Sequence, residues 1–105
     1  TVTRMMLPKY GAYAATKAAV EQLTRTFARE MGTRGITANI VSPGPVDTEL
    51  FRVGKTIQDI ERMSAMAALG RLGKVDDIAQ VVLFLVSDEA RWINGQNIAI
   101  NGGII

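Results

Sequence analysis

The sequence predicts an α/β fold in which helices connect the strands of a parallel sheet. Two short runs, residues 37–42 and 97–100, are predicted to be strands, and helical patterns precede and separate them. Strands that are connected through helices lie parallel, and parallel sheets are buried on both faces. Two strands are too few for such a sheet, so we expect the sheet to be incomplete within these 105 residues.

A long amphipathic helix is predicted over residues 11–31. Its larger apolar residues recur at spacings of three and four, along one face of the helix: Val20, Leu23, Phe27 and Met31. Gly32 then stands where a C-cap glycine commonly ends a helix. We therefore expect this helix to pack one side against the sheet and to end at Gly32.

The second half of the chain predicts two further helical segments. Residues 45–69 show little regular pattern, except that Ile57 to Met66 has the spacing of an amphipathic helix. Asp76 and Asp77 suit the first turn of a helix that continues over 78–86, because the helix dipole favours acidic residues there. Residues 78–86 are apolar almost all the way round, so we expect that helix to be buried, with a second subunit as one possible cover.

Composition excludes several classes of function. The chain has neither cysteine nor histidine, so disulfides and thiolate metal sites are excluded and no metal site is expected. The net charge of +2 is too small for a nucleic-acid-binding surface. No apolar run reaches the length of a membrane span and no signal peptide is visible, so we expect a cytoplasmic protein with no membrane partner.

Tyr13 and Lys17 are the most informative pair of residues in the chain. Residues four apart share one face of a helix, and an ammonium group beside a phenol favours the phenolate by charge attraction. Such a tyrosine can exchange a proton near neutral pH if a second positive charge or a desolvated pocket also contributes. The simpler interpretation of a lone Tyr-x-x-x-Lys motif is an exposed helical pair without a chemical role.

Small residues flank Tyr13, and four further segments follow it in order. They are Asn39 to Thr48 with a central Pro43-Gly44-Pro45, Gly70-Arg-Leu-Gly73 before an apolar helix, Asn94-Gly95-Gln96, and the terminal Asn101-Gly102-Gly103. Together these segments resemble the C-terminal half of the classical short-chain dehydrogenase/reductase family. The resemblance covers nearly the whole chain, and four segments in one order are far more specific than the Tyr/Lys pair.

The resemblance implies a fold and a domain organisation. Members of this family form a doubly wound parallel Rossmann sheet around NAD or NADP. Residues 1–105 would then be the C-terminal catalytic and substrate-binding half of a single Rossmann-type domain. The N-terminal nucleotide-binding half would be absent, since no G-x-G-x-x-G-like segment occurs here. The cofactor would be NAD or NADP, with NADPH favoured for a reductase.

The resemblance also implies the roles of individual residues. Tyr13 would be the general acid or base at the carbonyl oxygen, and Lys17 would assist it and hydrogen-bond the nicotinamide ribose. Four residues would line the nicotinamide side of the cofactor site: Pro43, Gly44, Val46 and Thr48. The catalytic serine of the family precedes the tyrosine by twelve or thirteen residues, which places it at Thr1 or just before the chain begins. Pro43-Gly44 without this context would be an ordinary turn.

Two functions remain open at this point. The first is an NAD(P)-dependent oxidoreductase: a carbonyl reductase or secondary alcohol dehydrogenase, with a 3-oxoacyl thioester reductase as one option. Its partners would be a small carbonyl or alcohol substrate and further copies of itself, as a dimer or tetramer. The alternative is a catalytically inactive fragment that serves only as an assembly or interaction module, because the nucleotide fingerprint is missing. Residues 1–105 alone are expected to be inactive.

Overall fold

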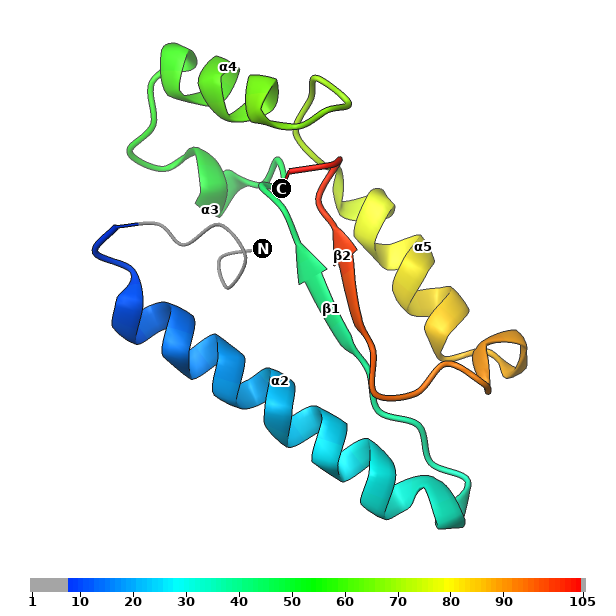
Figure 1. Cartoon of the computed structure of the whole chain (residues 1–105). Helices are drawn as coiled ribbons and strands as arrows, with labels where there is room; N and C mark the ends of the chain where they lie inside the picture. The colour runs from blue at the N-terminus through cyan, green and yellow to red at the C-terminus, as the bar shows by residue number, and fades with distance from the viewer. Residues whose placement is uncertain (1–7, 105) are drawn as a thin grey trace.

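The computed structural model describes residues 8–104. Its elements follow one another along the chain as α2 (Gly11–Met31), η1 (Gly32–Arg34), β1 (Ile40–Pro43), α3 (Glu49–Arg52), α4 (Ile57–Met66), α5 (Val75–Leu85), η2 (Asp88–Ala90) and β2 (Asn97–Ile100) (Figure 1). The long first helix, the amphipathic helix at 57–66 and the strand at 97–100 have the predicted bounds. The short helix α3 was not predicted.

The two strands form a parallel sheet, as predicted. Ile40 of β1 lies opposite Asn97 of β2, and the register continues to Pro43 opposite Ile100. Helices α3, α4 and α5 lie between the two strands in the chain, and α2 and α5 flank the sheet on opposite sides (Figure 1). Within residues 8–104 the sheet has only these two strands, so the α/β fold is present in incomplete form.

Helix α2 spans the predicted residues but does not end in the predicted way. Gly32 has a right-handed φ of −57°, and the chain continues as the 3-10 helix η1. The left-handed residue that stops it is Gly35, with φ of 71°, whose N–H donates to the Gly32 carbonyl. The expected C-cap at Gly32 was therefore wrong by three residues, because one 3-10 turn follows the α-helix before the chain reverses.

Strand β1 begins three residues later than predicted. Ala38 donates its N–H to Oδ1 of Asn94 at 2.8 Å, and Asn39 donates its side-chain amide to the Ile93 carbonyl at 2.7 Å. Ala38 and Asn39, which were predicted to belong to the strand, thus form hydrogen bonds with the loop at residues 93–94 and not with a neighbouring strand. Regular pairing starts only where the Ile40 N–H donates to the Gln96 carbonyl, at 2.8 Å.

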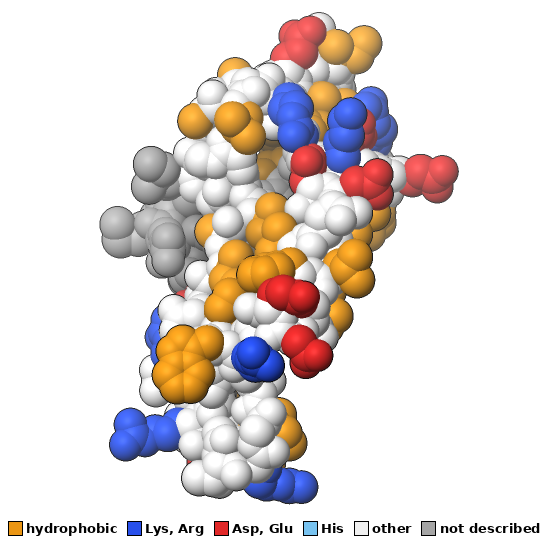
Figure 2. All heavy atoms as spheres, turned by 90° about the vertical axis from the view of Figure 1, so that its right-hand side faces the viewer, with side chains coloured by type: hydrophobic (Ala, Val, Ile, Leu, Met, Phe, Trp, Pro, Cys, Tyr) orange, Lys and Arg blue, Asp and Glu red, His pale blue; other side chains and the backbone are white. Residues whose placement is uncertain are grey.

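Helix α5 is not buried as predicted. None of its residues is buried, and Leu83 and Phe84 are 63% and 47% exposed. The reason is that α5 meets the sheet with one side only, while its other side faces outward. Figure 2 shows that outward face, on which hydrophobic side chains lie between charged ones. Whether a second subunit covers it stays a prediction.

The described residues have a small core. Only four hydrophobic side chains among them are buried, and these are Ala28, Ala67, Ala90 and Ile104. The accessible surface is 7735 Å², whereas a compact monomer of 11.4 kDa exposes about 5,800 Å². The radius of gyration is 15.5 Å, compared with about 13 Å for a compact domain of this length. Both values agree with an incomplete sheet whose helices lack part of their cover.

Candidate active site

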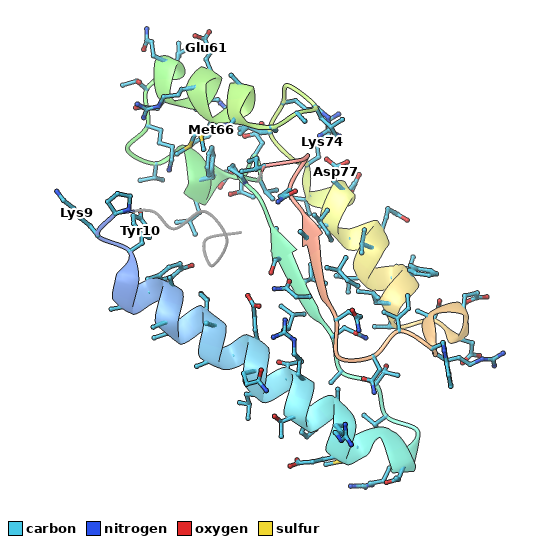
Figure 3. All side chains as sticks on the ribbon, viewed as in Figure 1. Lys9, Tyr10, Glu61, Met66, Lys74 and Asp77 are labelled. Carbon is cyan, nitrogen blue, oxygen red and sulfur yellow. The ribbon has the colours of Figure 1, made fainter. Side chains whose placement is uncertain are left out.

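Tyr13 and Lys17 lie together near the start of α2. The Lys17 ammonium is 5.2 Å from the centre of the Tyr13 ring, within the range of a cation–π contact. Tyr10 packs edge-on against Tyr13 with ring centres 6.0 Å apart, and Figure 3 shows Tyr10 next to Lys9 where α2 begins. Tyr13 is 47% exposed, so its phenol can be reached from solvent. The predicted pair is formed, at an accessible position.

The helix explains why the pair forms. Residues 11–20 of α2 are mostly small, and alanine favours the helix and leaves the larger side chains uncovered. The Thr16 hydroxyl donates to the Tyr13 carbonyl at 2.7 Å, so it does not compete for the phenol. One helical turn separates Tyr13 from Lys17, which brings the two side chains to the same face.

The Pro43–Thr48 segment lies at the carboxyl end of β1, where open α/β sheets bind ligands. Gly44 continues the strand pairing by donating its N–H to the Ile100 carbonyl at 2.9 Å. Val46 then bridges to Gly73: the Asp47 N–H donates to the Gly73 carbonyl at 2.8 Å, and the Gly73 N–H donates to the Pro45 carbonyl at 2.9 Å. These bonds hold the segment against the start of α5.

The bridge leaves polar groups of the segment available. In this parallel bridge Gly73 bonds to Pro45 and Asp47, the two neighbours of Val46, and not to Val46 itself. The N–H and C=O of Val46 therefore have no partner among residues 8–104. Thr48 caps α3, with its Oγ1 accepting from the Phe51 N–H at 3.1 Å. A hydroxyl that accepts in this way keeps its hydrogen for a second partner. Among residues 8–104, an amide without a partner and a hydroxyl donor without an acceptor therefore stand two residues apart.

Asp47 and Arg52 form an ion pair that was not predicted from the sequence. Two hydrogen bonds join them, from Nε to Oδ1 at 2.6 Å and from Nη2 to Oδ2 at 2.8 Å. These bonds hold the pKa of Asp47 below its ordinary value. The signal was present in the sequence, because an acid at a helix entry and an arginine five residues on can meet across one turn. Asp47 lies between Val46 and Thr48, two of the predicted cofactor residues, so the pair ties this segment to α3.

The segment 49–69 carries α3 and α4 away from the sheet and back. Thr56 and Asp59 form a capping box at the start of α4, and hydrogen bonds from Thr56 keep the pKa of Asp59 low. Several apolar side chains of this segment are strongly exposed, with Leu50 at 84% and Ile57 at 72%. A surface of this kind within one short segment is suited to covering an apolar ligand or another part of the protein.

A second ion pair fixes the chain just after this segment. Arg71 donates to both carboxylate oxygens of Asp77, at 2.7 and 3.1 Å. Asp77 also accepts from the Lys74 N–H at the start of α5, and Figure 3 shows Lys74 and Asp77 side by side there. These contacts, led by Arg71, lower the pKa of Asp77 to about 2. The 49–69 segment is therefore held at both ends by ion pairs.

The two groups of predicted residues come to one end of the molecule. Helix α2 and strand β1 run in opposite directions, so the start of α2 and the end of β1 lie toward the same end (Figure 1). The α2 helix is attached near its other end, where the Asn94 side chain donates to the Ala28 carbonyl at 3.0 Å. Thr1, the predicted counterpart of the catalytic serine, lies outside the described residues.

Comparison with known proteins identifies the family. A family model described as enoyl-(acyl carrier protein) reductase matches residues 1–105. A short-chain type dehydrogenase/reductase of Picea abies is 48% identical over 98% of this chain and 38% of its own length. The chain belongs to the short-chain dehydrogenase/reductase family.

Further members of the short-chain dehydrogenase/reductase family match the chain equally broadly. An NADPH-dependent aldehyde reductase-like protein of Arabidopsis thaliana, described as chloroplastic, is 47% identical over 98% of this chain. The crystal structure of the angucycline C-6 ketoreductase LanV with bound NADP superposes with a TM-score of 0.85 at 37% identity, over 98% of this chain and 40% of that one. The chain spans 38% of the length of the two curated relatives. Both the predicted family and the predicted Rossmann-type fold are confirmed.

Two classes of feature are not found in the described part of the chain. Among residues 8–104, no three acidic side chains gather as metal ligands would. No helix in the same range combines the length and the apolar character that crossing a bilayer requires.

Proposed function

We propose that residues 1–105 are the C-terminal half of a longer Rossmann-type domain that works as an NAD(P)H-dependent carbonyl reductase or secondary alcohol dehydrogenase. The observation that carries this proposal is the Tyr13–Lys17 pair, with the ammonium 5.2 Å from the ring centre and the phenol accessible. The family membership supports the reaction class. The length of the relatives supports a longer domain, since the chain spans 38% of them.

Tyr13 would move the proton in this reaction. In the reductive direction its hydroxyl gives a proton to the carbonyl oxygen, which becomes the hydroxyl of the product, and the phenolate is left behind. The Lys17 ammonium would stabilise that phenolate by charge, and it is the residue that would hold a ribose hydroxyl of the cofactor. When bound, a reduced nicotinamide would supply the hydride for the carbonyl carbon. In the oxidative direction the tyrosine takes the proton back.

The Pro43–Thr48 segment has the chemistry that a nicotinamide requires. A primary carboxamide both donates and accepts hydrogen bonds, and the N–H and C=O of Val46, which have no partner among residues 8–104, can donate to it and accept from it in turn. The Thr48 hydroxyl keeps a donor for the cofactor, and Pro43-Gly44 shapes the turn beneath it. NADPH is favoured over NADH, which agrees with one relative named as NADPH-dependent and with the NADP bound in the LanV structure.

The substrate would be a small carbonyl compound or the corresponding alcohol, covered by the 49–69 segment. The exposed apolar side chains of that segment favour a substrate with an apolar part. A 3-oxoacyl thioester is one candidate within this class. A cytoplasmic location and a dimeric or tetrameric assembly stay predictions from the sequence.

A second candidate function is supported by the exposed surface. The chain exposes 7735 Å², about 2,000 Å² more than a compact monomer of its mass. If the natural product were only this chain, it would be an inactive module held to another chain through its open sheet and apolar helices. Saturable NADPH binding by the isolated chain would argue against this alternative.

Replacing Tyr13 tests the proposed function. In the full-length protein, Tyr13→Phe should lower kcat for carbonyl reduction by at least about 10²-fold, because general acid catalysis contributes that much. NADPH binding, followed by its fluorescence, should persist. The matched control is Tyr10→Phe, which removes a hydroxyl one helical turn away and should keep most of the activity. Equal activity in the two variants would remove Tyr13 from the mechanism.

A further inference from the structure

We propose that the turn Asn101–Gly103 is a positioning element of the cofactor site. It contacts the Pro43–Val46 segment on one side and residues 67–69, at the end of the 49–69 segment, on the other. By contacting both segments, the turn would fix their relative position. The Pro43–Val46 segment, which would face the nicotinamide, and the 49–69 segment, which would cover the substrate, would then stand correctly relative to each other. The inference rests on the proposed function, and nothing in the sequence motif itself assigns this role to the turn.

The first contact joins the turn to the end of β1. A Cβ atom added to Gly44 would lie 2.8 Å from Cα and 2.9 Å from Cβ of Asn101, much closer than real Cβ atoms approach a backbone. The glycine therefore allows the two chains to touch. The neighbouring hydrogen bond from the Gly44 N–H to the Ile100 carbonyl, at 2.9 Å, fixes this approach. Movement of Asn101 would consequently displace Gly44 and the residues that follow it.

The second contact joins the turn to the end of the 49–69 segment. A Cβ atom on Gly103 would lie 2.8 Å from Cβ of Ala68, and one on Gly102 would lie 3.2 Å from Cβ of Ala67. The Leu69 N–H donates to the Gly102 carbonyl at 3.1 Å. Gly102 and Gly103 both have positive φ, 64° and 84°. Conformation and close packing thus both require glycine at these two positions.

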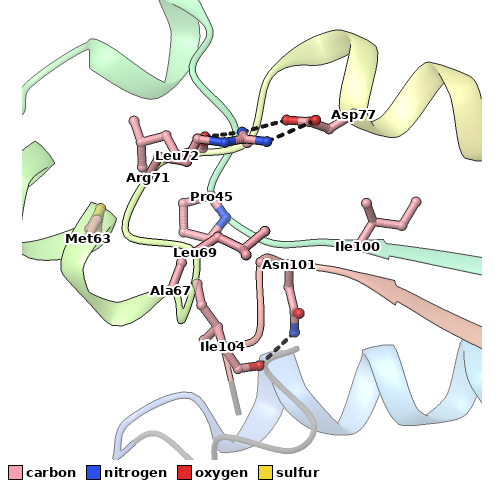
Figure 4. A pocket seen from close by; sticks show the side chains of 12 residues that line it. Pro45, Met63, Ala67, Leu69, Arg71, Leu72, Asp77, Ile100, Asn101 and Ile104 are labelled. Carbon is pink, nitrogen blue, oxygen red and sulfur yellow. Dashed lines mark hydrogen bonds and ion pairs between the residues drawn. The ribbon is translucent and has the colours of Figure 1, made fainter.

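The Asn101 side chain keeps the turn in shape. Its Nδ2 donates to the Ile104 carbonyl at 2.6 Å, and its Oδ1 accepts from the Gly103 N–H at 3.1 Å. Ile104 is 6% exposed and so anchors the end of the turn in the protein. Figure 4 shows Asn101 bonded to Ile104, with Pro45 and Leu69 close to the turn.

The three segments meet around one small cavity. Pro45, Leu69 and Asn101 line the same space of about 50 Å³, together with Arg71 of the ion pair that follows the 49–69 segment (Figure 4). A space of this size holds only a few water molecules. No ligand of the size of a cofactor can enter it, so it serves as the joint between the segments and not as a binding pocket.

Gly103→Ala in the full-length protein tests the proposal, with Gly35→Ala as its matched control. Gly35 also has a positive φ, 71°, but a Cβ there would meet nothing within 4 Å. Both variants therefore carry backbone strain, and only Gly103→Ala also pushes against Ala68. We expect Gly103→Ala to raise the KM for NADPH about tenfold, as a misplacement of binding groups by a fraction of an ångström can do. Gly35→Ala should leave that KM unchanged.

Two further measurements make the test specific. Hydrogen exchange should become faster at the amides of Asp47 and Gly73 in Gly103→Ala, because their bonds, from Asp47 to Gly73 and from Gly73 to Pro45, join the chain after β1 to the chain after the 49–69 segment. Adding Ala68→Gly should restore most of the lost affinity by removing the Cβ that Gly103→Ala would touch. If Gly103→Ala does not fold, Asn101→Ala removes both side-chain bonds of the turn and should change the same readouts in the same direction.

The outcomes separate this inference from the proposed function. An equal loss of Tm in Gly103→Ala and Gly35→Ala, with unchanged KM and unchanged exchange at Asp47 and Gly73, would show a merely structural turn and overturn the inference. A wild-type protein that neither binds nor oxidises NADPH would instead overturn the proposed function. The exchange rates would even then decide whether the turn supports the two segments.

Discussion

Arg52 of α3 donates two hydrogen bonds, 2.6 and 2.8 Å long, to the carboxylate of Asp47, which lies between Val46 and Thr48 of the candidate cofactor segment. Asp47 also donates its N–H to the Gly73 carbonyl. One residue therefore connects the end of β1, the start of α3 and the chain that leads into α5. A planar guanidinium with two parallel bonds fixes orientation better than a single contact does.

Breaking this pair should weaken cofactor binding more than folding. In the full-length protein, Arg52→Gln is expected to raise the KM for NADPH about two- to fivefold, the range that loss of an exposed ion pair allows. The control is Arg62→Gln, which removes a single 3.0 Å bond to Asp59 on the outer side of α4. Steady-state kinetics on both variants gives the comparison. An identical KM in the two would show that Asp47–Arg52 has no part in placing the segment.

The Arg71–Asp77 pair predicts a pH dependence of stability. The pKa of Asp77 falls from 3.8 to about 2 in the folded protein, so its stabilising contribution is fully present above about pH 4 and is lost as the pH falls toward 2. Arg71→Gln should therefore lower Tm near pH 6, and its difference from wild type should shrink progressively between pH 4 and pH 2. Thermal unfolding at a series of pH values measures this. A constant difference over the whole range would contradict the assignment.

Asn94 is expected to be the side chain that most strongly connects α2 to the sheet. It donates to the Ala28 carbonyl and accepts from the Ala38 N–H, at 3.0 and 2.8 Å. Asn94→Ala should destabilise the full-length protein by about 2 kcal/mol, since each bond contributes about 1 kcal/mol. The expected fall in Tm is roughly 4–8 °C.

Gln96→Ala provides the control for this variant. Gln96 is exposed, and within the described range 8–104 its side chain bonds only to the Asn94 carbonyl, at 2.8 Å. Its replacement should change Tm by no more than about 2 °C, as is usual for exposed residues. A larger effect of Gln96→Ala than of Asn94→Ala would show that the connection runs through the backbone of the loop and not through the asparagine.

The intact mass of the natural protein decides between the two candidate functions. A mass well above 11.4 kDa is expected, because the relatives are longer and the sheet is incomplete. Electrospray mass spectrometry of the protein purified from its source provides this value. A mass of 11.4 kDa would favour the assembly module and direct attention to the chain that covers its open sheet.

The local elements and the chemistry they offer could be predicted from the order of the residues. The spacing of apolar residues predicted both α2 and α4. In each helix the pattern connects residues only three or four positions apart, so it depends little on the rest of the protein. Tyr13 and Lys17 could be paired because a helix places residues four apart on one face. The order of the glycine- and proline-containing segments was enough to identify the family.

The contacts between distant segments could be seen only in the folded chain. Asn94 delays the start of β1, Gly73 bridges to Val46, and Gly44 touches Asn101, and each contact joins residues at least 27 positions apart. No local pattern encodes such contacts, because they arise from the parallel crossover between β1 and β2. The exposure of α5 also depended on what its neighbours cover. Its apolar sequence gave the tendency to be buried, but burial requires a partner surface that residues 8–104 supply on one side only.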